Sequence, residues 1–320
     1  MIERKLDSFS TPIAQVGFGT SQIANTDHKY KGAKYVHVKE AREILRVAFD
    51  LGVNFFDTSP TYGNAETLVG ELKAKHKEKI IVATKSGLNS EGVRNFSLPR
   101  LEKEIEISRK RLNVECLDVF QLTKPSISDL EDGELFSFLG ELKNKGLCRY
   151  TGVIVGDIET GYQCIESGQV DCLQVLYHLL YQDTENLICE AKRKGLSVIV
   201  RSPLSSGLLT GNYTAKTKFD SNDGRSNYFS GVGFERRLKI LHGIQKDLNI
   251  RNQELMGFSL RFILSNPGVS VIVPAASNAE QVRRLVSIGE GSSPFSSDEL
   301  VKIKSTVMRY MEGVDIVVQN

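Results

Sequence analysis

Apolar and polar positions along this chain repeat in one unit, which consists of an amphipathic helix, a glycine and a short apolar run. The unit is clearest in the stretches AREILRVAFDLGVNFFDT, FLGELKNKGLCRYTGVIV and ICEAKRKGLSVIVRSP. Apolar residues recur at helical spacing in the first part of each stretch. Gly52, Gly146 and Gly195 then stand where a helix requires a left-handed C-terminal cap. The pattern therefore predicts helices that end at these glycines and lead directly into strands.

The apolar runs are nearly continuous, which indicates strands buried on both faces, as in a parallel sheet. We count eight of them, at 13–18, 53–57, 79–84, 116–122, 151–155, 171–177, 197–200 and 269–273. Helical patterns lie between most of them, near 38–49, 64–75, 98–112, 133–145, 158–167, 185–194, 235–248 and 278–288, with a last helix near 296–312. This alternation predicts an α/β fold, a closed (β/α)8 TIM barrel formed by residues 1–320 as one domain. An open doubly wound sheet is the alternative.

Composition narrows the class of protein. The chain has 320 residues, of which 40% are apolar and 25% charged, as is ordinary for a globular protein with a sizeable core. A net charge of +2 argues against a dedicated nucleic-acid-binding protein. The five cysteines stand singly, no apolar run approaches about 18 residues, and the first residues lack the apolar core of a signal peptide. We therefore expect a cytoplasmic protein with reduced thiols, no membrane span and no bound metal.

Three residues with reactive side chains fall at the ends of neighbouring strands. Asp57 ends VNFFD, Tyr62 lies in the following TSPTYGN, and Lys85 ends KIIVATK. A phenol has a pKa of about 10 in water, and a nearby ammonium favours the phenolate. A carboxylate would keep that ammonium charged, so that the tyrosine donates a proton to a carbonyl oxygen as hydride reaches the carbon. The alternative is structural: Asp57 caps a helix and Lys85 extends to solvent.

Longer motifs around these residues resemble those of the aldo-keto reductases. FDTSPTYGNAETLVGE is similar to the second-strand signature of that family, and KIIVATK is similar to its lysine strand. SPLSSGLLTG resembles its pyrophosphate loop, and VSVIVPAASNAEQVRRL resembles its last strand and adenosine-phosphate helix. The matches follow the family's order over almost the whole chain. The resemblance implies an NADPH-dependent oxidoreductase for an aldehyde, ketone or keto-sugar, with Tyr62 as proton donor tuned by Lys85 and Asp57.

The resemblance also implies that NADPH binds in an extended form without a Rossmann glycine fingerprint. No G-x-G-x-x-G motif follows any strand, which is consistent with this. A helix that begins at Ser277 and Asn278 would offer free N–H groups to a phosphate, and Arg284 would add charge for a 2′-phosphate. An ordinary helix cap and a surface arginine are the alternative. The preference for NADPH over NADH rests on the resemblance alone. The implied cofactor contacts are Gly19, Thr20, Gln174, Arg201, Ser202, Leu204, Gly207, Ala276, Ser277, Asn278, Gln281 and Arg284.

The chain departs from the family at the nicotinamide end of the expected site. Relatives end strand 4 with a histidine, where this chain has Thr123, which can donate a hydrogen bond but carries no charge. Relatives supply Ser-Asn from strand 5, where this chain has Ile154 and Val155. Arg201 replaces an aromatic residue that stacks on nicotinamide, whereas Gln174 resembles the retained carboxamide partner. Thr123 is thus a weakened catalytic contact, and Arg201 is a candidate partner for an anionic substrate or a phosphate.

Three histidines are candidates to replace the missing one, although a lone histidine is more often structural. His178 follows strand 6, and His28 and His37 lie in the connection 19–37. That connection and 202–233 both follow strands, so both belong to the face where such barrels keep their chemistry. The first of them is basic and could receive an anionic sugar, although a solvated loop is the simpler interpretation. The basic residues of the connection 19–37 are Lys29, Lys31 and Lys34, and its tyrosines are Tyr30 and Tyr35.

Two other functions stay open. An epimerase, dehydratase or lyase on the same scaffold would use Tyr62 and Lys85 as an acid-base pair without net hydride transfer. A regulatory subunit would bind NADPH without turnover. Tight NADPH binding without oxidation across a panel of carbonyl compounds would favour these functions over a reductase.

Overall fold

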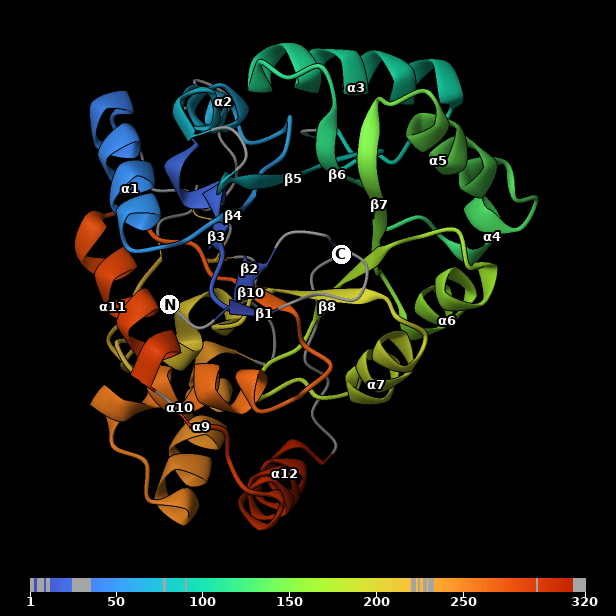
Figure 1. Ribbon diagram of the computed structural model, residues 1–320. Coiled ribbons are helices and arrows are strands. Elements are labelled where there is room, and N and C mark those ends of the chain that lie inside the picture. Colours follow the sequence, from blue (N-terminus) through green and yellow to red (C-terminus); the bar gives the residue numbers. More distant parts are fainter. Residues whose placement is uncertain are drawn as a thin grey trace.

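Eight parallel strands form the centre of the molecule, and helices surround them (Figure 1). The computed structural model describes residues 3–4, 9, 12–24, 36–76, 79–89, 91–219, 223, 225–226, 229, 233–291 and 293–312. The barrel strands are β3 Phe18–Gly19, β4 Phe55–Asp57, β5 Ile81–Ser86, β6 Leu117–Thr123, β7 Cys148–Ile154, β8 Cys172–Leu176, β9 Ser197–Arg201 and β10 Val271–Val273. They pair in chain order, each parallel to the next.

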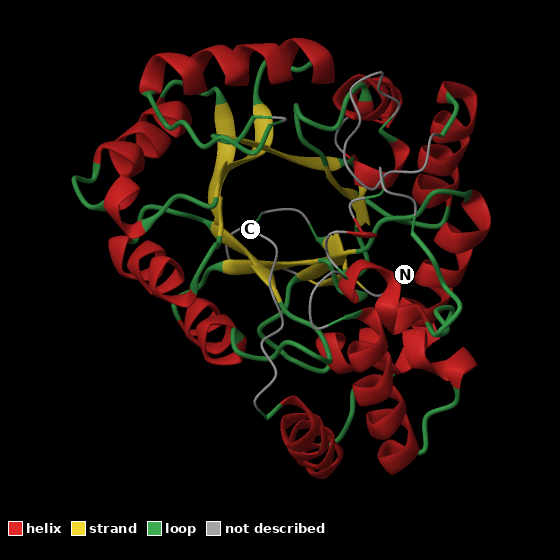
Figure 2. Ribbon diagram, turned by 180° about the vertical axis from the view of Figure 1, so that it is seen from behind, coloured by secondary structure: helices red, strands yellow, loops and turns green. Residues whose placement is uncertain are grey.

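The sheet closes between its first and last strands. Gly17 N donates to Ile272 O at 2.8 Å, and Gly19 N donates to Pro274 O at 2.9 Å. Closure needs a bare backbone here, because a Cβ on Gly19 would lie 3.0 Å from the carbonyl oxygen of Val273. From behind, the strands form a ring inside the ring of helices (Figure 2). The prediction of a (β/α)8 TIM barrel is therefore confirmed over the open sheet.

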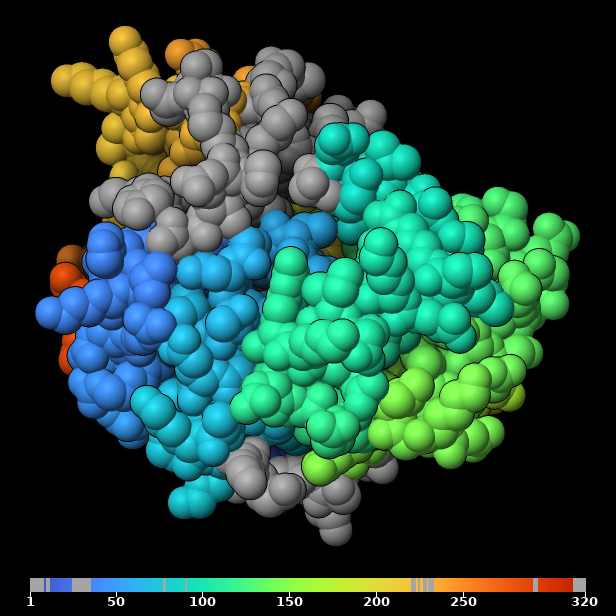
Figure 3. Space-filling view, turned by 90° about the horizontal axis from the view of Figure 1, so that it is seen from above, coloured from blue at the N-terminus to red at the C-terminus, as the bar shows by residue number. Residues whose placement is uncertain are grey.

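The helices follow the strands around the barrel, so that neighbours in sequence are neighbours in space. Seen from above, the helices between residues 38 and 144 form one continuous surface that runs from blue to green (Figure 3). The described helices are α1 Val38–Asp50, α2 Ala65–His76, α3 Leu98–Leu112, α4 Ile127–Leu130, α5 Glu134–Asn144, α6 Ile158–Ser167, α7 Glu185–Arg193, α9 Phe234–Leu248, α10 Asn252–Leu264, α11 Ala279–Gly291 and α12 Ser297–Met311. Two 3-10 helices, η1 Thr20–Ile23 and η3 Ser205–Thr210, follow β3 and β9.

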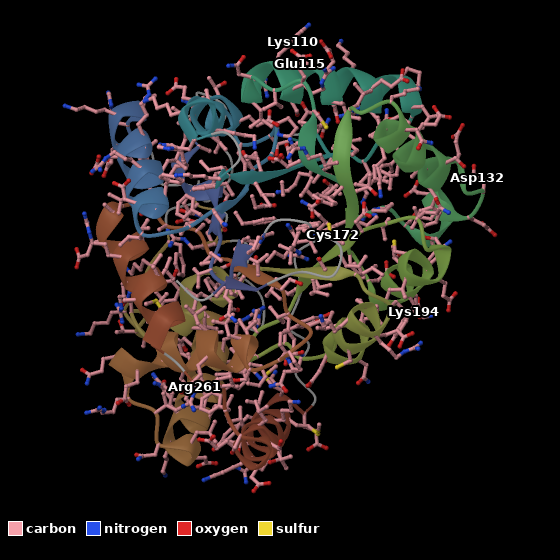
Figure 4. The ribbon with its side chains drawn as sticks, in the orientation of Figure 1. Lys110, Glu115, Asp132, Cys172, Lys194 and Arg261 are labelled. Carbon is pink, nitrogen blue, oxygen red and sulfur yellow. The ribbon has the colours of Figure 1, made fainter. Side chains whose placement is uncertain are left out.

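Side chains fill the inside of the barrel at the end where the strands begin. The aromatic rings of Phe9 and Tyr150 lie 4.3 Å apart there, between centroids. A short hairpin of β1 Glu3–Arg4 and β2 Ile13–Ala14 flanks Phe9. Figure 4 shows Cys172 toward the inside of the barrel. The buried inner cluster comprises Phe9, Ile13, Phe55, Ile81, Ala83, Val119, Cys172, Ile199, Val271 and Val273. Because apolar groups close this end, polar chemistry is confined to the mouth, where the strands end.

Two sequence predictions differ from the structure. The run 13–18 does not form one strand. Ile13–Ala14 pairs antiparallel with Glu3–Arg4, and only Phe18–Gly19 joins the barrel. The helices Ile127–Leu130 and Asn252–Leu264 were not predicted from the sequence. Both deviations arise where tertiary packing overrides the local pattern.

The predicted helix caps and the reduced thiols agree with the structure. Gly52, Gly146 and Gly195 have positive φ angles of 91°, 67° and 79°, as a left-handed helix cap requires. All five cysteines are free thiols. Within the described ranges, no helix combines the length and apolar character needed to cross a membrane. In the same ranges, no group of three or more His, Cys, Asp or Glu side chains could hold a metal ion.

Candidate active site

A buried ion pair forms the centre of the site. Residues alternate between inward and outward positions along a strand, so Asp57 continues the inward row of Phe55, and Lys85 continues that of Ala83. Lys85 Nζ donates to Asp57 Oδ2 at 2.7 Å and to Thr58 O at 2.8 Å. Asp57 and Lys85 are only 5% and 6% exposed, so water screens their attraction little.

The remaining carboxylate oxygen and the phenol complete this arrangement. Gln174 Nε2 donates to Asp57 Oδ1 at 2.9 Å from β8, across the inside of the barrel. Lys85 Nζ lies 5.0 Å from the centroid of the Tyr62 ring. The structure therefore brings together the phenol, the ammonium and the carboxylate that the sequence analysis singled out. It places Gln174 against the carboxylate, a contact that the sequence does not reveal.

The loop that carries Tyr62 is held by a local network. Ser59 Oγ and Thr61 Oγ1 share a hydrogen bond of 2.8 Å, and Tyr62 N donates to Ser59 O at 3.0 Å. Below it, the fully buried Glu66 accepts a hydrogen bond from Thr84 Oγ1 at 2.7 Å, which ties the start of α2 to β5. These hydrogen bonds fix the backbone of the loop that carries Tyr62 and the start of α2.

Beside this cluster, the ends of β6 and β7 carry few polar side chains. Thr123 ends β6 at 7% exposure, and its strand partner Ile154 ends β7. Ile154 shares the inward row of Gly152, whereas Val155 belongs to the outer core between the strands and helices. A Cβ on Gly152 would lie 2.4 Å from Cys172 Sγ, so a larger residue does not fit there. Of the two residues that replace the family's polar pair, only Ile154 thus faces inward.

The sequence analysis missed Gln121, a fully buried amide two residues before Thr123. It pairs in register with Lys85 on one side and Gly152 on the other. Neither its amide oxygen nor its amide nitrogen has a hydrogen-bond partner in the described part of the chain. Period-two counting back from Thr123 would have found this inward polar residue.

The implied cofactor residues gather on adjacent strands. Apart from Gln174 on β8, they lie at the ends of β9, β10 and β3 or follow them, and these strands are neighbours where the barrel closes. After β9, Ser202, Ser205, Ser206 and Gly207 have positive φ angles, and a Cβ on Gly207 would lie 2.4 Å from Tyr213 Oη. This strained turn presents backbone groups along one side of the mouth.

The ends of β3 and β10 position the other implied contacts. Thr20 Oγ1 donates to the carbonyl oxygen of Asp57 at 3.0 Å, so this residue also supports the ion pair. At the start of α11, Asn278 Oδ1 accepts from Gln281 N, and Gln281 Oε1 accepts from Ser277 N, both at 2.9 Å. Arg284 is exposed on the same helix. The helix start thus combines polar side chains, N–H groups and a surface cation.

The candidate histidines differ in their surroundings. His178 is fully buried, and its Nδ1 accepts a hydrogen bond from Leu180 N at 3.2 Å. Burial, together with the positive charges of Arg201 and Arg237, lowers the pKa of His178 to about 3, so its ring is neutral at physiological pH. A neutral ring can donate a hydrogen bond, but it cannot supply the charge that the sequence analysis sought.

The connection 19–37 contributes few candidate site residues to the described part of the chain. His37 is exposed and caps α1, where its Nδ1 accepts from Lys39 N at 3.3 Å. His28 and the basic and aromatic residues between 29 and 35 lie outside the described residues.

Known proteins resemble this chain over most of its length. The Aldo/keto reductase family model matches residues 15–307. The NADH-specific methylglyoxal reductase of Escherichia coli is 30% identical over 262 residues, 74% of this chain and 78% of that protein. L-glyceraldehyde 3-phosphate reductase of the same species is 28% identical over 293 residues, 83% of each chain. The glycerol dehydrogenase structure from Gluconobacter oxydans has a TM-score of 0.79 at 25% identity and covers 96% of this chain and 95% of its own.

Proposed function

Because this chain belongs to the aldo-keto reductase family, we propose that it reduces a small carbonyl compound with NADPH and that Tyr62 donates the proton. Membership of the family makes the chain an oxidoreductase. The finer proposal depends on one observation, the contact of the buried Lys85 ammonium with both the Asp57 carboxylate and the ring of Tyr62. The substrate class is an aldehyde, ketone or keto-sugar. The proposal includes a cytoplasmic location, which the five free thiols support.

The residues at the mouth fit a nicotinamide cofactor. The turn after β9 and the start of α11 offer backbone and side-chain donors on neighbouring strands. Arg284 supplies the positive charge that favours NADPH over NADH. The contacts proposed from this part of the chain are Gly19, Thr20, Gln174, Arg201, Ser202, Leu204, Gly207, Ala276, Ser277, Asn278, Gln281 and Arg284.

Each member of the ion-pair cluster has a defined task in the proposed reaction. A nicotinamide cofactor, when bound, would be the source of the hydride that the carbonyl carbon accepts. The Tyr62 phenol donates its proton to the carbonyl oxygen, so that the carbonyl becomes an alcohol. The Lys85 ammonium stabilises the phenolate that remains, because the opposite charges lie close together in a poorly solvated site. Asp57 keeps Lys85 charged and oriented, and Gln174 fixes Asp57.

Thr123 takes the position from which the family's histidine contacts the substrate. Its hydroxyl can donate a hydrogen bond to the carbonyl oxygen, but it adds no charge. We expect Thr123→Val to lower kcat/KM by about tenfold or less, the value of one neutral hydrogen bond. Substrate polarisation therefore depends mainly on Tyr62 and its neighbours.

One pair of assays tests the proposed function. Fluorescence titration of the purified protein with NADPH and with NADH measures cofactor binding and preference. Absorbance of NADPH during incubation with short aldehydes, ketones and keto-sugars measures turnover. The proposal expects binding of NADPH and its oxidation by at least one carbonyl class. Tight NADPH binding without oxidation across the panel would instead support the regulatory or non-redox function.

A further inference from the structure

The two residues that flank Lys85 along β5 carry hydroxyl groups that face the surrounding helices. Side chains alternate along a strand, so Thr84 and Ser86 point outward where Lys85 points inward. Both residues are buried, at 0% and 2% exposure. Thr84 Oγ1 donates to Glu66 Oε1 at 2.7 Å, and Ser86 Oγ donates to Glu104 Oε2. A carboxylate therefore holds the strand from outside on each side of Lys85.

The two glutamates belong to α2 and α3, which lie side by side outside β5 (Figure 1). Each of them has an arginine as its counter-charge. Arg111 Nη1 lies 3.3 Å from Glu66 Oε2. Arg100 Nε donates to Glu104 Oε1 at 2.9 Å, and Gly87 N donates to Glu104 Oε2 at 3.3 Å. These contacts resist displacement, because breaking one of them leaves a poorly solvated charge without its partner.

Arg111 connects this arrangement to the loop that carries Tyr62. Its Nη1 also donates to Pro60 O at 3.2 Å, two residues before the phenol. Glu66 follows Tyr62 by four residues and lies at the start of α2. The two helices pack closely, since a Cβ on Gly70 would lie 2.7 Å from Arg111 O. The fully buried Glu66 is therefore linked both to the strand that carries the ammonium and to the loop that carries the phenol.

We propose that Glu66 and Glu104 are positioning residues, which hold Lys85 at the distance from Tyr62 that proton transfer requires. Both act through β5, from the layer of helices outside the barrel. Lys85 Nζ lies 5.0 Å from the centroid of the Tyr62 ring, so a displacement of β5 weakens the attraction between the ammonium and the phenolate. This inference rests on the proposed function, since it concerns the stabilisation of the phenolate that remains when Tyr62 has given its proton.

Removal of the two hydroxyl groups tests the proposal without deleting a buried carboxylate. Thr84→Val is expected to lower kcat by about tenfold and to change KM by less than about twofold, because the alignment of the proton donor is lost and substrate binding is not. Thr84→Ser keeps the hydroxyl group and should restore the wild-type kcat. Ser86→Ala should lower kcat in the same way, and the double variant Thr84→Val/Ser86→Ala should lower it further. Wild-type kcat in the double variant would overturn the proposal.

A matched control removes the same kind of contact from another strand. Thr151 is fully buried on β7, and its Oγ1 donates to Asp171 Oδ2 at 3.2 Å. Asp171 also has a counter-charge, because Lys143 Nζ lies 2.8 Å from its Oδ1. Thr151→Val should lower the melting temperature as Thr84→Val does, but it should leave kcat unchanged. Equal losses of kcat in the two variants would make the role of Glu66 purely structural and would overturn the proposal.

The titration of Tyr62 gives a readout that does not depend on turnover. In protein labelled with carbon-13 at the ζ carbon of its tyrosines, the NMR signal of Tyr62 is the one that Tyr62→Phe removes. A phenol beside an ammonium loses its proton at lower pH than a phenol from which the ammonium has moved away. The midpoint of this signal should therefore move to higher pH by at least about 0.5 unit in Thr84→Val and should not move in Thr151→Val.

Together these measurements separate the inference from the proposed function. If the wild type reduces no carbonyl compound but the midpoint of Tyr62 moves in Thr84→Val alone, the reductase proposal fails and the positioning role remains. If the wild type reduces a carbonyl compound and Thr84→Val keeps both its kcat and the midpoint of Tyr62, the positioning role fails and the reductase proposal remains.

Discussion

Two parts of the barrel mouth differ in the groups that surround their positive charges. One part lies at the ends of β4 and β5, and the other lies at the ends of β6 and β9. In the first, Lys85 is bonded to Asp57, and Gln174 occupies the other carboxylate oxygen. In the second, the guanidinium groups of Arg201 and Arg94 act on Lys124. A balanced cluster suits a step that is the same for every substrate, such as proton donation. A rim with several positive charges suits recognition, because it can steer an anionic ligand toward the mouth.

The same contrast appears in the resemblance to the family. The first half retains the tyrosine, lysine and aspartate of the family motif. The second half replaces the histidine by Thr123, the polar pair by Ile154 and Val155, and the aromatic residue by Arg201. We infer that the chemistry has been kept and that the recognition has changed. The predictions below test each half separately.

The largest expected effect is that of Tyr62→Phe. Loss of the phenolic proton should lower kcat by about 10²- to 10⁴-fold, the usual contribution of a positioned acid. NADPH affinity and thermal stability should change little, because the ring stays over Lys85. Steady-state kinetics and a melting curve check this prediction. A Phe variant that reduces substrate at the wild-type rate would remove Tyr62 from the mechanism.

Asp57→Asn should affect both stability and activity. It leaves the Lys85 ammonium buried without its carboxylate, which can lower the free energy of unfolding by up to about 3–5 kcal/mol. Asp118→Asn is the matched control, because Asp118 is 4% exposed and bonded to Lys73 at 2.6 Å, outside the mouth. Denaturant unfolding should show a lower free energy of unfolding in both variants, whereas kcat should fall only in Asp57→Asn. Equal kcat in the two variants would mean that the Asp57 pair is purely structural.

The pH dependence of KM should differ between charged and neutral substrates. The pKa of Lys124 is about 8, so the group is charged below that pH and loses its proton above it. Arg201 and Arg94, the charged groups that act on it, stay protonated throughout. KM for an anionic aldehyde should therefore be flat below about pH 8 and then rise, while KM for a neutral aldehyde should not show this rise. Lys124→Arg should flatten the rise, and identical profiles for both substrates would contradict the prediction.

The last prediction concerns His178 and folding. Its pKa is about 3 in the folded protein, whereas an unfolded histidine titrates near about 6.5. Between these values the unfolded chain holds the extra proton, so the free energy of unfolding should fall with decreasing pH, by at most about 1.4 kcal/mol per pH unit. His178→Gln should remove this slope, and His242→Gln, at an exposed position on α9, should not. Urea unfolding between pH 4 and 7 measures it, and an unchanged slope in His178→Gln would disprove burial of the neutral ring.

Much of the fold followed from local patterns. Continuous apolar runs and glycine caps predicted the barrel strands, and Leu98–Leu112 and Ile158–Ser167 were predicted to the residue. Asp57 and Lys85 could be paired from sequence because their strands are adjacent and the contact depends on backbone topology alone. The helix Asn252–Leu264 was missed although its buried residues lie on one broad face, because Gly257 and Ser259 weaken its apolar pattern.

The second half of the mouth could not be assembled in this way. Lys124 and Arg201 come from β6 and β9, which are separated by two strands in the barrel, and nothing in the local sequence relates them. The buried tautomer of His178 depends on a hydrogen bond from Leu180 N that only the turn after β8 creates. Recognition built across the barrel therefore needs the three-dimensional structure, whereas chemistry built on neighbouring strands does not.

Isotope transfer tests the central claim most directly. NADPH carrying deuterium at the transferable position of its nicotinamide ring is incubated with the protein and a carbonyl compound from the panel, and the product is analysed by mass spectrometry. The account predicts an alcohol that carries one deuterium on the former carbonyl carbon, and a rate of labelling that collapses in Tyr62→Phe. Conversion of the substrate without deuterium, with the cofactor unchanged, would show that the tyrosine, lysine and aspartate serve a reaction other than reduction.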